Sequence, residues 1–309
     1  MLLAIDVGNT HITVGLFREK VLKHTWRLNT NRHYTSDELG MQLCQLFLLS
    51  FPRRRESIMT HGSPSSTRLA DGPAGSLEGP LTPAGMTWLG LSGICVASVV
   101  PSLDEPLRVG CETYFRKKPL FVGPKTTLGI KNLYRNPEEV GADRLVNAVA
   151  VHTIYRKATI VVDFGTATTL DCVSAKGEYL GGAICPGMEL AGEWLATHTA
   201  KLPRVTFHPP PPEGLRRVSA EASAKADNPF PYPAIGKTTK ESLQSGLFWG
   251  YISLVDGLLQ RLTREMGGRP TVIVTGGLSS LIGPHLKGVS RIAPDLTLEG
   301  LRLVWERNR

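Results

Sequence analysis

The chain has 309 residues, of which 41% are hydrophobic, so it can form two domains of ordinary size with a substantial core. No stretch approaches the roughly 18 uninterrupted apolar residues of a membrane-spanning helix. The sequence starts without the basic segment of a secretory signal, and its five cysteines are scattered without a C-x-x-C pair. We therefore expect a cytoplasmic protein with reduced cysteines, no disulfides and no zinc site.

The formal net charge of +8 raises the question of nucleic-acid binding. Nucleic-acid-binding proteins usually gather their positive charge in one patch with interleaved aromatic residues. Here the densest basic cluster is Arg53, Arg54 and Arg55, in a segment that otherwise has the composition of a loop. We expect a solvated basic surface suited to anionic nucleotides and acids, and we do not expect a nucleic-acid partner.

The chain begins with an apolar run at residues 2–5, which predicts a buried strand. The run leads into Asp-Val-Gly-Asn-Thr at residues 6–10, the first turn, and alternating Ile12, Val14 and Leu16 predict a second strand. A carboxylate in such a turn can hold a cation, and its glycine lets the backbone approach a phosphate. Its N–H groups and hydroxyl can bind phosphate oxygens, so this turn is a candidate phosphate site.

The next predicted element is a helix with Ser36 as its N-cap. Its apolar residues recur at helical spacing, at Leu39, Leu43, Leu46 and Phe47.

Regular structure is expected to resume with a buried strand at residues 93–100, a helix at 103–115 and a strand at 119–122. Gly-Ala-Asp-Arg at residues 141–144 then precedes a predicted helix at 145–155. The residues that follow these elements give the strongest indication of the fold.

Residues 158–187 repeat the pattern of the chain's beginning. An apolar run ends in Asp-Phe-Gly-Thr at residues 163–166, the second turn, and a further strand at 168–173 leads to a hairpin turn at Lys176 and Gly177. One such turn is a weak signal, because polar hairpins after buried strands are common. Two copies indicate an internal duplication, and they predict two similar lobes that face each other across a cleft.

The remaining chain is predicted to contain a helix at residues 188–197 and a longer one at 239–266. A Pro-rich stretch at residues 205–233 separates them and is expected to be a loop or flap. A buried strand from residue 270 then ends in Thr-Gly-Gly at 275–277.

In this order the motifs resemble those of the type III pantothenate kinases, a family of the actin and sugar-kinase ATPase superfamily. The resemblance covers most of the chain. It rests on the two turns and on Gly-Ala-Asp-Arg with Tyr134 and Pro137 upstream. Further matches are Gly181-Gly182-Ala183-Ile184, Pro186-Gly187, Gly236-Lys237-Thr238-Thr239, Ser245-Gly246 and Thr275-Gly276-Gly277. The glycine turns are common to the superfamily, whereas Gly-Ala-Asp-Arg in this set is more specific.

The resemblance implies an α/β fold with two similar ribonuclease-H-like or actin-like lobes and an ATP cleft between them. We place the N-terminal lobe at residues 1–156, with an insertion at about 53–87. The C-terminal lobe would be residues 157–309, with a Pro-rich insertion at about 205–235. Both insertions are longer than we expect for the family, and Thr238 stands where many relatives carry Asn. These departures affect accessory contacts more than the reaction.

The implied reaction is ATP-dependent phosphorylation of pantothenate to 4′-phosphopantothenate, the first step of coenzyme A biosynthesis. In phosphoryl transfer a protein acts mainly by positioning the reactants and by neutralising charge. Asp143 would be the general base, while Arg144 would offer its fork to the substrate carboxylate. The implied cofactors are ATP, Mg²⁺ held by Asp6 through the phosphates, and a monovalent cation, K⁺ or NH₄⁺, at Asp163.

The other implied contacts divide into two groups. Those with ATP are Asp6, Val7, Gly8, Asn9, Thr10, His11, Ile12, Thr13 and Thr166. Those with the substrate are Tyr134, Gly141, Ala142, Asp143, Arg144 and Thr239. The glycine turn at residues 275–277 would lie near the adenosine.

Three alternatives stay open at this point. They are another small-molecule kinase acting on a sugar or acid, an ATP-binding transcriptional regulator without turnover, and a filament-forming actin relative. Family relatives are homodimers with the substrate site near the subunit interface, and the helix at residues 239–266 carries glycines that allow close approach of a neighbour. We therefore expect a homodimer and no membrane partner.

Overall fold

The structure, a computed structural model, describes residues 1–50, 90–207 and 232–309. The basic cluster at residues 53–55 and the insertion predicted at 53–87 lie outside the described residues. So does most of the predicted Pro-rich stretch at 205–235. No helix within the described ranges combines the length and apolarity needed to cross a membrane.

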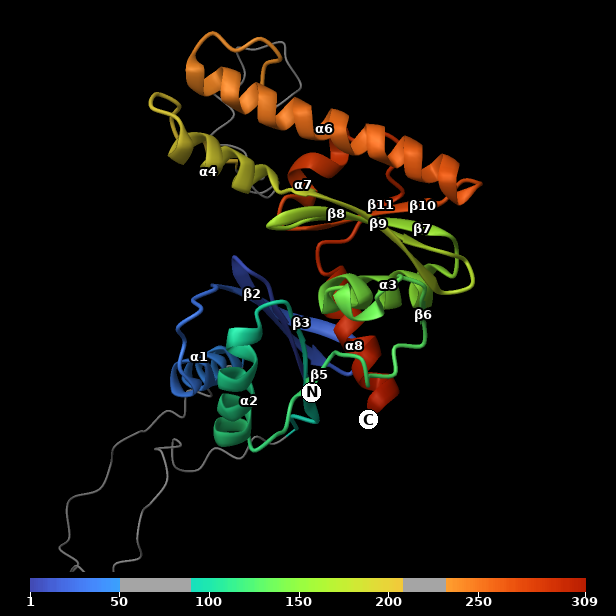
Figure 1. Cartoon of the computed structure of the whole chain (residues 1–309). Coiled ribbons are helices and arrows are strands. Elements are labelled where there is room, and N and C mark those ends of the chain that lie inside the picture. The colour runs from blue at the N-terminus through green and yellow to red at the C-terminus, as the bar shows by residue number, and fades with distance from the viewer. Residues whose placement is uncertain (51–89, 208–231) are drawn as a thin grey trace, which may run out of the picture.

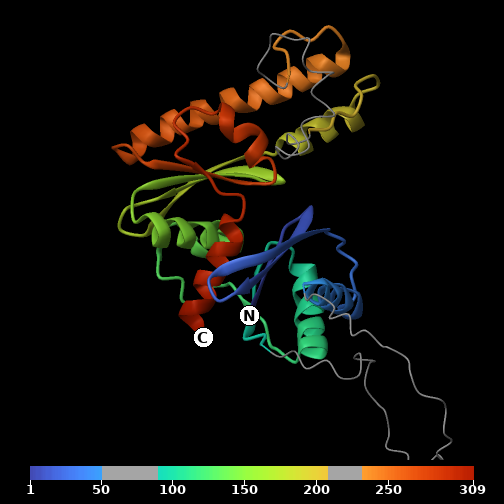
Figure 2. The same cartoon turned by 180° about the vertical axis from the view of Figure 1, so that it is seen from behind.

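The molecule is built on two mixed sheets, each with helices packed against it (Figures 1 and 2). The first sheet has the order β3-β2-β1-β4-β5. Its strands are β1 (Leu2–Val7), β2 (His11–Arg18), β3 (Val21–Asn29), β4 (Gly93–Ser98) and β5 (Leu120–Phe121). The second has the order β11-β10-β7-β8-β9-β6. Its strands are β6 (Lys131–Asn132), β7 (Thr159–Phe164), β8 (Ala167–Val173), β9 (Glu178–Pro186), β10 (Thr271–Gly276) and β11 (Arg291–Ile292).

The two sheets repeat one topology. In each, the strand that leads into an acidic turn pairs antiparallel with the next strand and parallel with a later one, β1 with β2 and β4, and β7 with β8 and β10. The order β3-β2-β1-β4-β5 therefore recurs as β9-β8-β7-β10-β11. The predicted duplication and the predicted two-lobed α/β fold are confirmed.

All the predicted helices are present, with corrections at the start of three of them, and the last two helices of the chain were not predicted. The helices are α1 (Ser36–Leu49), α2 (Pro101–Phe115), α3 (Ala142–Tyr155), α4 (Met188–His198), α6 (Thr239–Met266), α7 (Ser279–Ile282) and α8 (Leu296–Asn308), with short 3-10 turns η1 (Pro137–Glu139) and η3 (Gly283–His285). The helix predicted at residues 103–115 begins at residue 101. The N-cap of α1 is Thr35 and not Ser36, because Thr35 and Glu38 form a reciprocal capping box. Helix α3 begins at Ala142 and not at residue 145, which places Asp143 and Arg144 in its first turn.

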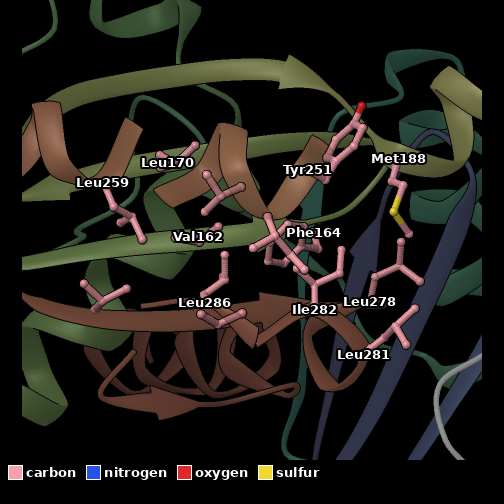
Figure 3. Packing of buried hydrophobic residues seen from close by; sticks show 14 of the residues in the cluster. Val162, Phe164, Leu170, Met188, Tyr251, Leu259, Leu278, Leu281, Ile282 and Leu286 are labelled. Carbon is pink, nitrogen blue, oxygen red and sulfur yellow. The ribbon is translucent and has the colours of Figure 1, made fainter. Parts of the chain in front are cut away.

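The centre of the second sheet is covered on both faces, as the continuous apolar run of β7 requires. Alternate residues of β7 point to opposite faces, so Val162 and Phe164 pack with Tyr251 of α6, while Val161 packs with α3 (Figure 3). Helices α6 and α3 therefore lie on opposite sides of this sheet (Figure 1).

At the boundary between the lobes, segments from one half of the sequence pack with the other half. Helix α8, the last in the sequence, packs on the inner face of the first sheet, the face that carries Ala4 and Ala97, together with α3. Strand β6 precedes residue 156 but pairs with β9 of the second sheet. The predicted division of the chain after residue 156 stays a proposal. The packing of α3 and α8 joins the two halves of the molecule.

All five cysteines are free thiols in the structure. Burial raises the pKa of the thiols of Cys95, Cys111 and Cys172 to about 12, so these side chains act as small apolar packing groups.

The substitution Leu301→Ala tests the role of α8 in joining the lobes. Leu301 is fully buried between α3 and the first sheet, so its truncation should lower the free energy of unfolding by about 2–5 kcal/mol. Urea unfolding measures this loss. Leu49→Ala is the control, because Leu49 is 70% exposed and its loss should change stability by less than about 0.5 kcal/mol. Equal effects of the two substitutions would contradict this role of α8.

Candidate active site

The first and second turns meet where the two lobes face each other. The hydroxyl oxygens of Thr10 and Thr166 lie 2.7 Å apart and share a hydrogen bond across the junction. Each turn is closed by a backbone hydrogen bond from its glycine, but the first turn is one residue longer: Gly8 N–H donates to the His11 carbonyl at 3.0 Å, and Gly165 N–H donates to the Ala167 carbonyl at 3.1 Å. The structure thus brings together the predicted ATP residues at 6–13 and the predicted ATP contact on the other lobe.

The first turn is held from the end of β3. The Thr30 hydroxyl donates to the Gly8 carbonyl at 2.6 Å, and Arg32 Nη2 donates to Asn9 Oδ1 at 3.0 Å. A β-carbon on Gly8 would lie 3.0 Å from the His11 carbonyl oxygen, so a side chain there would crowd the turn. The turn is a supported backbone loop of the kind that can bind an anion.

Two carboxylates stand at the corresponding ends of β1 and β7. Asp6 is paired with Thr13 and Ala97, and Asp163 with Thr169 and Thr275 in the other sheet. Burial raises the pKa of Asp6 well above its usual range, and the charges of Asp143 and Asp163 add to the effect. Burial, followed by the charge of Asp143, raises the pKa of Asp163 to about 7. In both groups the protein compensates the ionised form poorly, which disfavours negative charge there until a cation binds.

Asp143 is the third carboxylate of this group and lies in the first turn of α3. Burial raises its pKa, and the charge of Asp171 does so too, while the hydrogen bond from the Arg144 backbone N–H to its Oδ1 at 2.8 Å acts in the opposite direction. A β-carbon on Gly141 would lie 2.5 Å from Asp143 Oδ1. The glycine of Gly-Ala-Asp-Arg is thus required by the close approach of this side chain.

Arg144 is buried in a polar network. Its Nε and Nη2 both lie 2.7 Å from Asp171 Oδ1, which also accepts from the Tyr179 hydroxyl at 2.7 Å. The other oxygen, Oδ2, accepts from the Thr169 hydroxyl at 2.9 Å. One edge of the guanidinium is therefore engaged by the protein, and only the rest of the fork can contact a substrate. Sequence reasoning missed Asp171; its signal was a carboxylate between the apolar residues Leu170 and Cys172 of a predicted strand.

Asn147 is a second residue that sequence reasoning missed. It is 1% exposed, donates from Nδ2 to Asp163 Oδ2 at 3.0 Å, and accepts from the Thr297 hydroxyl of α8 at 2.9 Å. Asn147 lies one helical turn after Asp143, so the two share a face of α3. That spacing was the available signal, and the contact fixes one oxygen of Asp163.

The third glycine turn lies beside Asp163. Gly276 has a φ of +90°, which favours glycine, and a β-carbon there would lie 2.4 Å from Asp163 Oδ1. The absence of a side chain thus allows the backbone of the third glycine turn to pack closely against this oxygen.

The predicted substrate residues are only partly brought together. Tyr134 lies beside the Arg144 network, with its ring centroid 6.2 Å from that of Tyr179. Thr239 is the first residue of α6, on the opposite side of the second sheet from α3 (Figure 1). A single chain therefore does not place Thr239 next to Asp143, and its role stays a prediction.

The chain is similar to proteins of a known family. The family model for type III pantothenate kinases matches residues 2–261. A type III pantothenate kinase of Anaeromyxobacter sp. (strain K) is 41% identical over 309 residues, covering 100% of both chains. That of Myxococcus xanthus is 40% identical over 308 residues, covering 100% of this chain and 99% of the relative. A solved structure from Campylobacter jejuni, described as a conserved Baf family transcriptional activator, aligns with a TM-score of 0.52 at 17% identity over 99% of this chain and 98% of that one, which supports the fold alone.

The substitution Asp163→Asn tests the burial of this carboxylate. A carboxyl group whose pKa is higher in the folded state than in the unfolded chain makes the protein less stable as pH rises from about 4 towards 7. Asparagine removes that dependence and can still accept from Asn147. In buffers free of K⁺, NH₄⁺ and divalent ions, urea unfolding should show a larger stabilisation by Asp163→Asn at about pH 8 than at about pH 5. An equal effect at both values would show that Asp163 titrates normally.

Proposed function

The chain belongs to the type III pantothenate kinase family, and we propose that it transfers the γ-phosphoryl group of ATP to the hydroxyl of pantothenate. The product would be 4′-phosphopantothenate, in the first step of coenzyme A biosynthesis. The observation that carries the proposal is the meeting of the two turns beside Asp6, Asp143 and Asp163. This arrangement suits phosphoryl transfer, in which positioning and charge neutralisation do most of the work.

Asp143 is the proposed general base. Its carboxylate would accept the proton of the pantothenate hydroxyl as the hydroxyl oxygen attacks the γ-phosphorus and the bond to the ADP oxygen breaks. A pKa raised by burial makes this carboxylate a stronger base than an exposed aspartate. The Arg144 N–H holds one of its oxygens, which orients the other.

The two turns would bind the phosphates between the lobes. Thr10 and Thr166 form a hydrogen bond with each other in the structure, and each hydroxyl could instead donate to a phosphate oxygen. Residues 8–13 would supply backbone N–H groups from one lobe, and the turn at 275–277 would lie near the adenosine of the nucleotide.

The partly buried carboxylates fit the proposed cations. The described ranges contain no group of three or more His, Cys, Asp or Glu able to hold a metal ion together, so ATP phosphates would complete the coordination of Mg²⁺ at Asp6. Mg²⁺ would neutralise charge on the phosphates. For K⁺ or NH₄⁺, the fitting observation is Asp163, with one oxygen fixed by Asn147 and the other facing Gly276, which has no side chain.

The substrate would bind between Asp143 and the Arg144 network, beside Tyr134. Because α6 and α3 cover opposite faces of the second sheet, Thr239 would contact substrate bound to a second copy of the chain. Exposed apolar side chains on β9, α4 and α6 fit such a homodimer, namely Leu180, Ile184, Leu190, Trp194 and Leu254. A cytoplasmic location accords with this role and stays part of the proposal.

The substitution Asp143→Asn tests the proposed reaction. ADP release from ATP and Mg²⁺ should require pantothenate, should increase with K⁺ or NH₄⁺, and should fall about 10²–10⁴-fold in the variant, because the base is lost. Glu138→Gln is a matched control, since Glu138 is an exposed carboxylate shortly before α3 and its variant should keep full activity. Turnover with another hydroxylated acid or sugar but not with pantothenate would contradict the proposed substrate.

A further inference from the structure

Arg27 lies in a row of side chains that leads to the proposed magnesium site. It pairs with Thr13 across β3 and β2, and Thr13 pairs with Asp6 across β2 and β1. Residues directly opposite one another in a sheet project to the same face. Arg27, Thr13 and Asp6 therefore share the inner face of the first sheet, the face that also carries Ala4.

The Arg27 side chain also reaches the other lobe. A β-carbon on Gly277 would lie 2.9 Å from Arg27 Nη1 and 3.5 Å from Nη2, so the guanidinium packs directly against this glycine. Gly277 follows β10, in the turn proposed to lie near the adenosine. The guanidinium thus lies between the two halves of the proposed ATP site.

The charge of Arg27 is available to a ligand. None of the ion pairs within the described ranges involves Arg27, although its positive charge opposes the rise in the pKa of Asp6. Neither residues 6–13 nor residues 163–168 include a lysine or an arginine. The two proposed phosphate-binding turns therefore provide no permanent cation of their own, and ATP would bring several negative charges beside three carboxylates.

We propose that Arg27 binds phosphate oxygens of ATP and neutralises the charge on them during phosphoryl transfer, which makes it a catalytic residue. The planar guanidinium can donate to two phosphate oxygens at once in a fixed fork, whereas a lysine ammonium acts as a point charge. Arg27 exchanges no proton, because it acts only as a hydrogen-bond donor and a positive charge. The inference rests on the proposed kinase function and adds to it a phosphate ligand from β3.

The kinetic test compares Arg27→Met, Arg27→Lys and the control Arg18→Met. Arg18 is an exposed arginine at the opposite end of the same hairpin. Arg27→Met should lower kcat/KM for ATP by about 10²-fold or more, at an unchanged KM for pantothenate, and Arg27→Lys should restore part of the loss. Arg18→Met should match the wild type. A loss below about threefold in Arg27→Met, or an equal loss in Arg18→Met, would overturn the inference.

A binding series separates this role from a structural one and from the proposed function. Affinities for ATP, ADP and adenosine are measured by calorimetry without pantothenate, with thermal unfolding as a check on folding. Arg27→Met should weaken ATP and ADP binding and leave adenosine binding unchanged. An equal loss for all three ligands, or no ATP binding by the wild type, would overturn the inference. If the phosphate-dependent loss is found but the wild type does not phosphorylate pantothenate, the proposed function fails and the assignment of Arg27 to phosphate binding stands.

Discussion

Three carboxylates that share one poorly solvated junction set the conditions for the rest of the site. Asp6, Asp143 and Asp163 come from the end of β1, the start of α3 and the end of β7, and the charge of Asp143 raises the pKa of the other two. Like charges held away from water cost free energy until cations compensate them. The surrounding structure packs glycines closely against Asp143 and Asp163, and the Asn147 amide donates a hydrogen bond to Asp163.

Much of the fold could be predicted because its central strands and longest helix have strong local signals. Strands β1 and β7 are continuous apolar runs, and α6 has an N-cap at Thr238 and a left-handed Gly267 at its end. Strand β3 gave no such signal, because most of its side chains are exposed and its alternation is weak. The N-cap of α1 was predicted one residue too late. Ser36 and Thr35 both carry hydroxyls, but only Thr35 has Glu38 at the spacing of a capping box.

Site residues could be predicted where they lie together in short motifs. They could not be predicted where their roles depend on strand register and helix packing. Both turns and Gly-Ala-Asp-Arg are contiguous in sequence, so the residue types alone point to phosphate and acid–base chemistry. Asp171, Asn147 and Arg27 each lie inside a regular element, and their roles arise only when strand register and helix packing bring them to Arg144, Asp163 and Gly277. Conversely, a motif match could not show that part of the Arg144 fork is already occupied.

The packing of α8 has a consequence for how the protein is made. The inner face of the first sheet, with Leu2, Ala4, Cys95 and Ala97, is fully covered only when α8 joins α3 on it. Ribosomes synthesise α8 after every other described element, so the lobe begun first cannot complete its core during most of translation. The nascent chain must carry an apolar sheet face that is open to chaperones or to aggregation. Truncation from the C-terminus should therefore damage the N-terminal lobe before it damages the sheet that lies next to α8 in sequence.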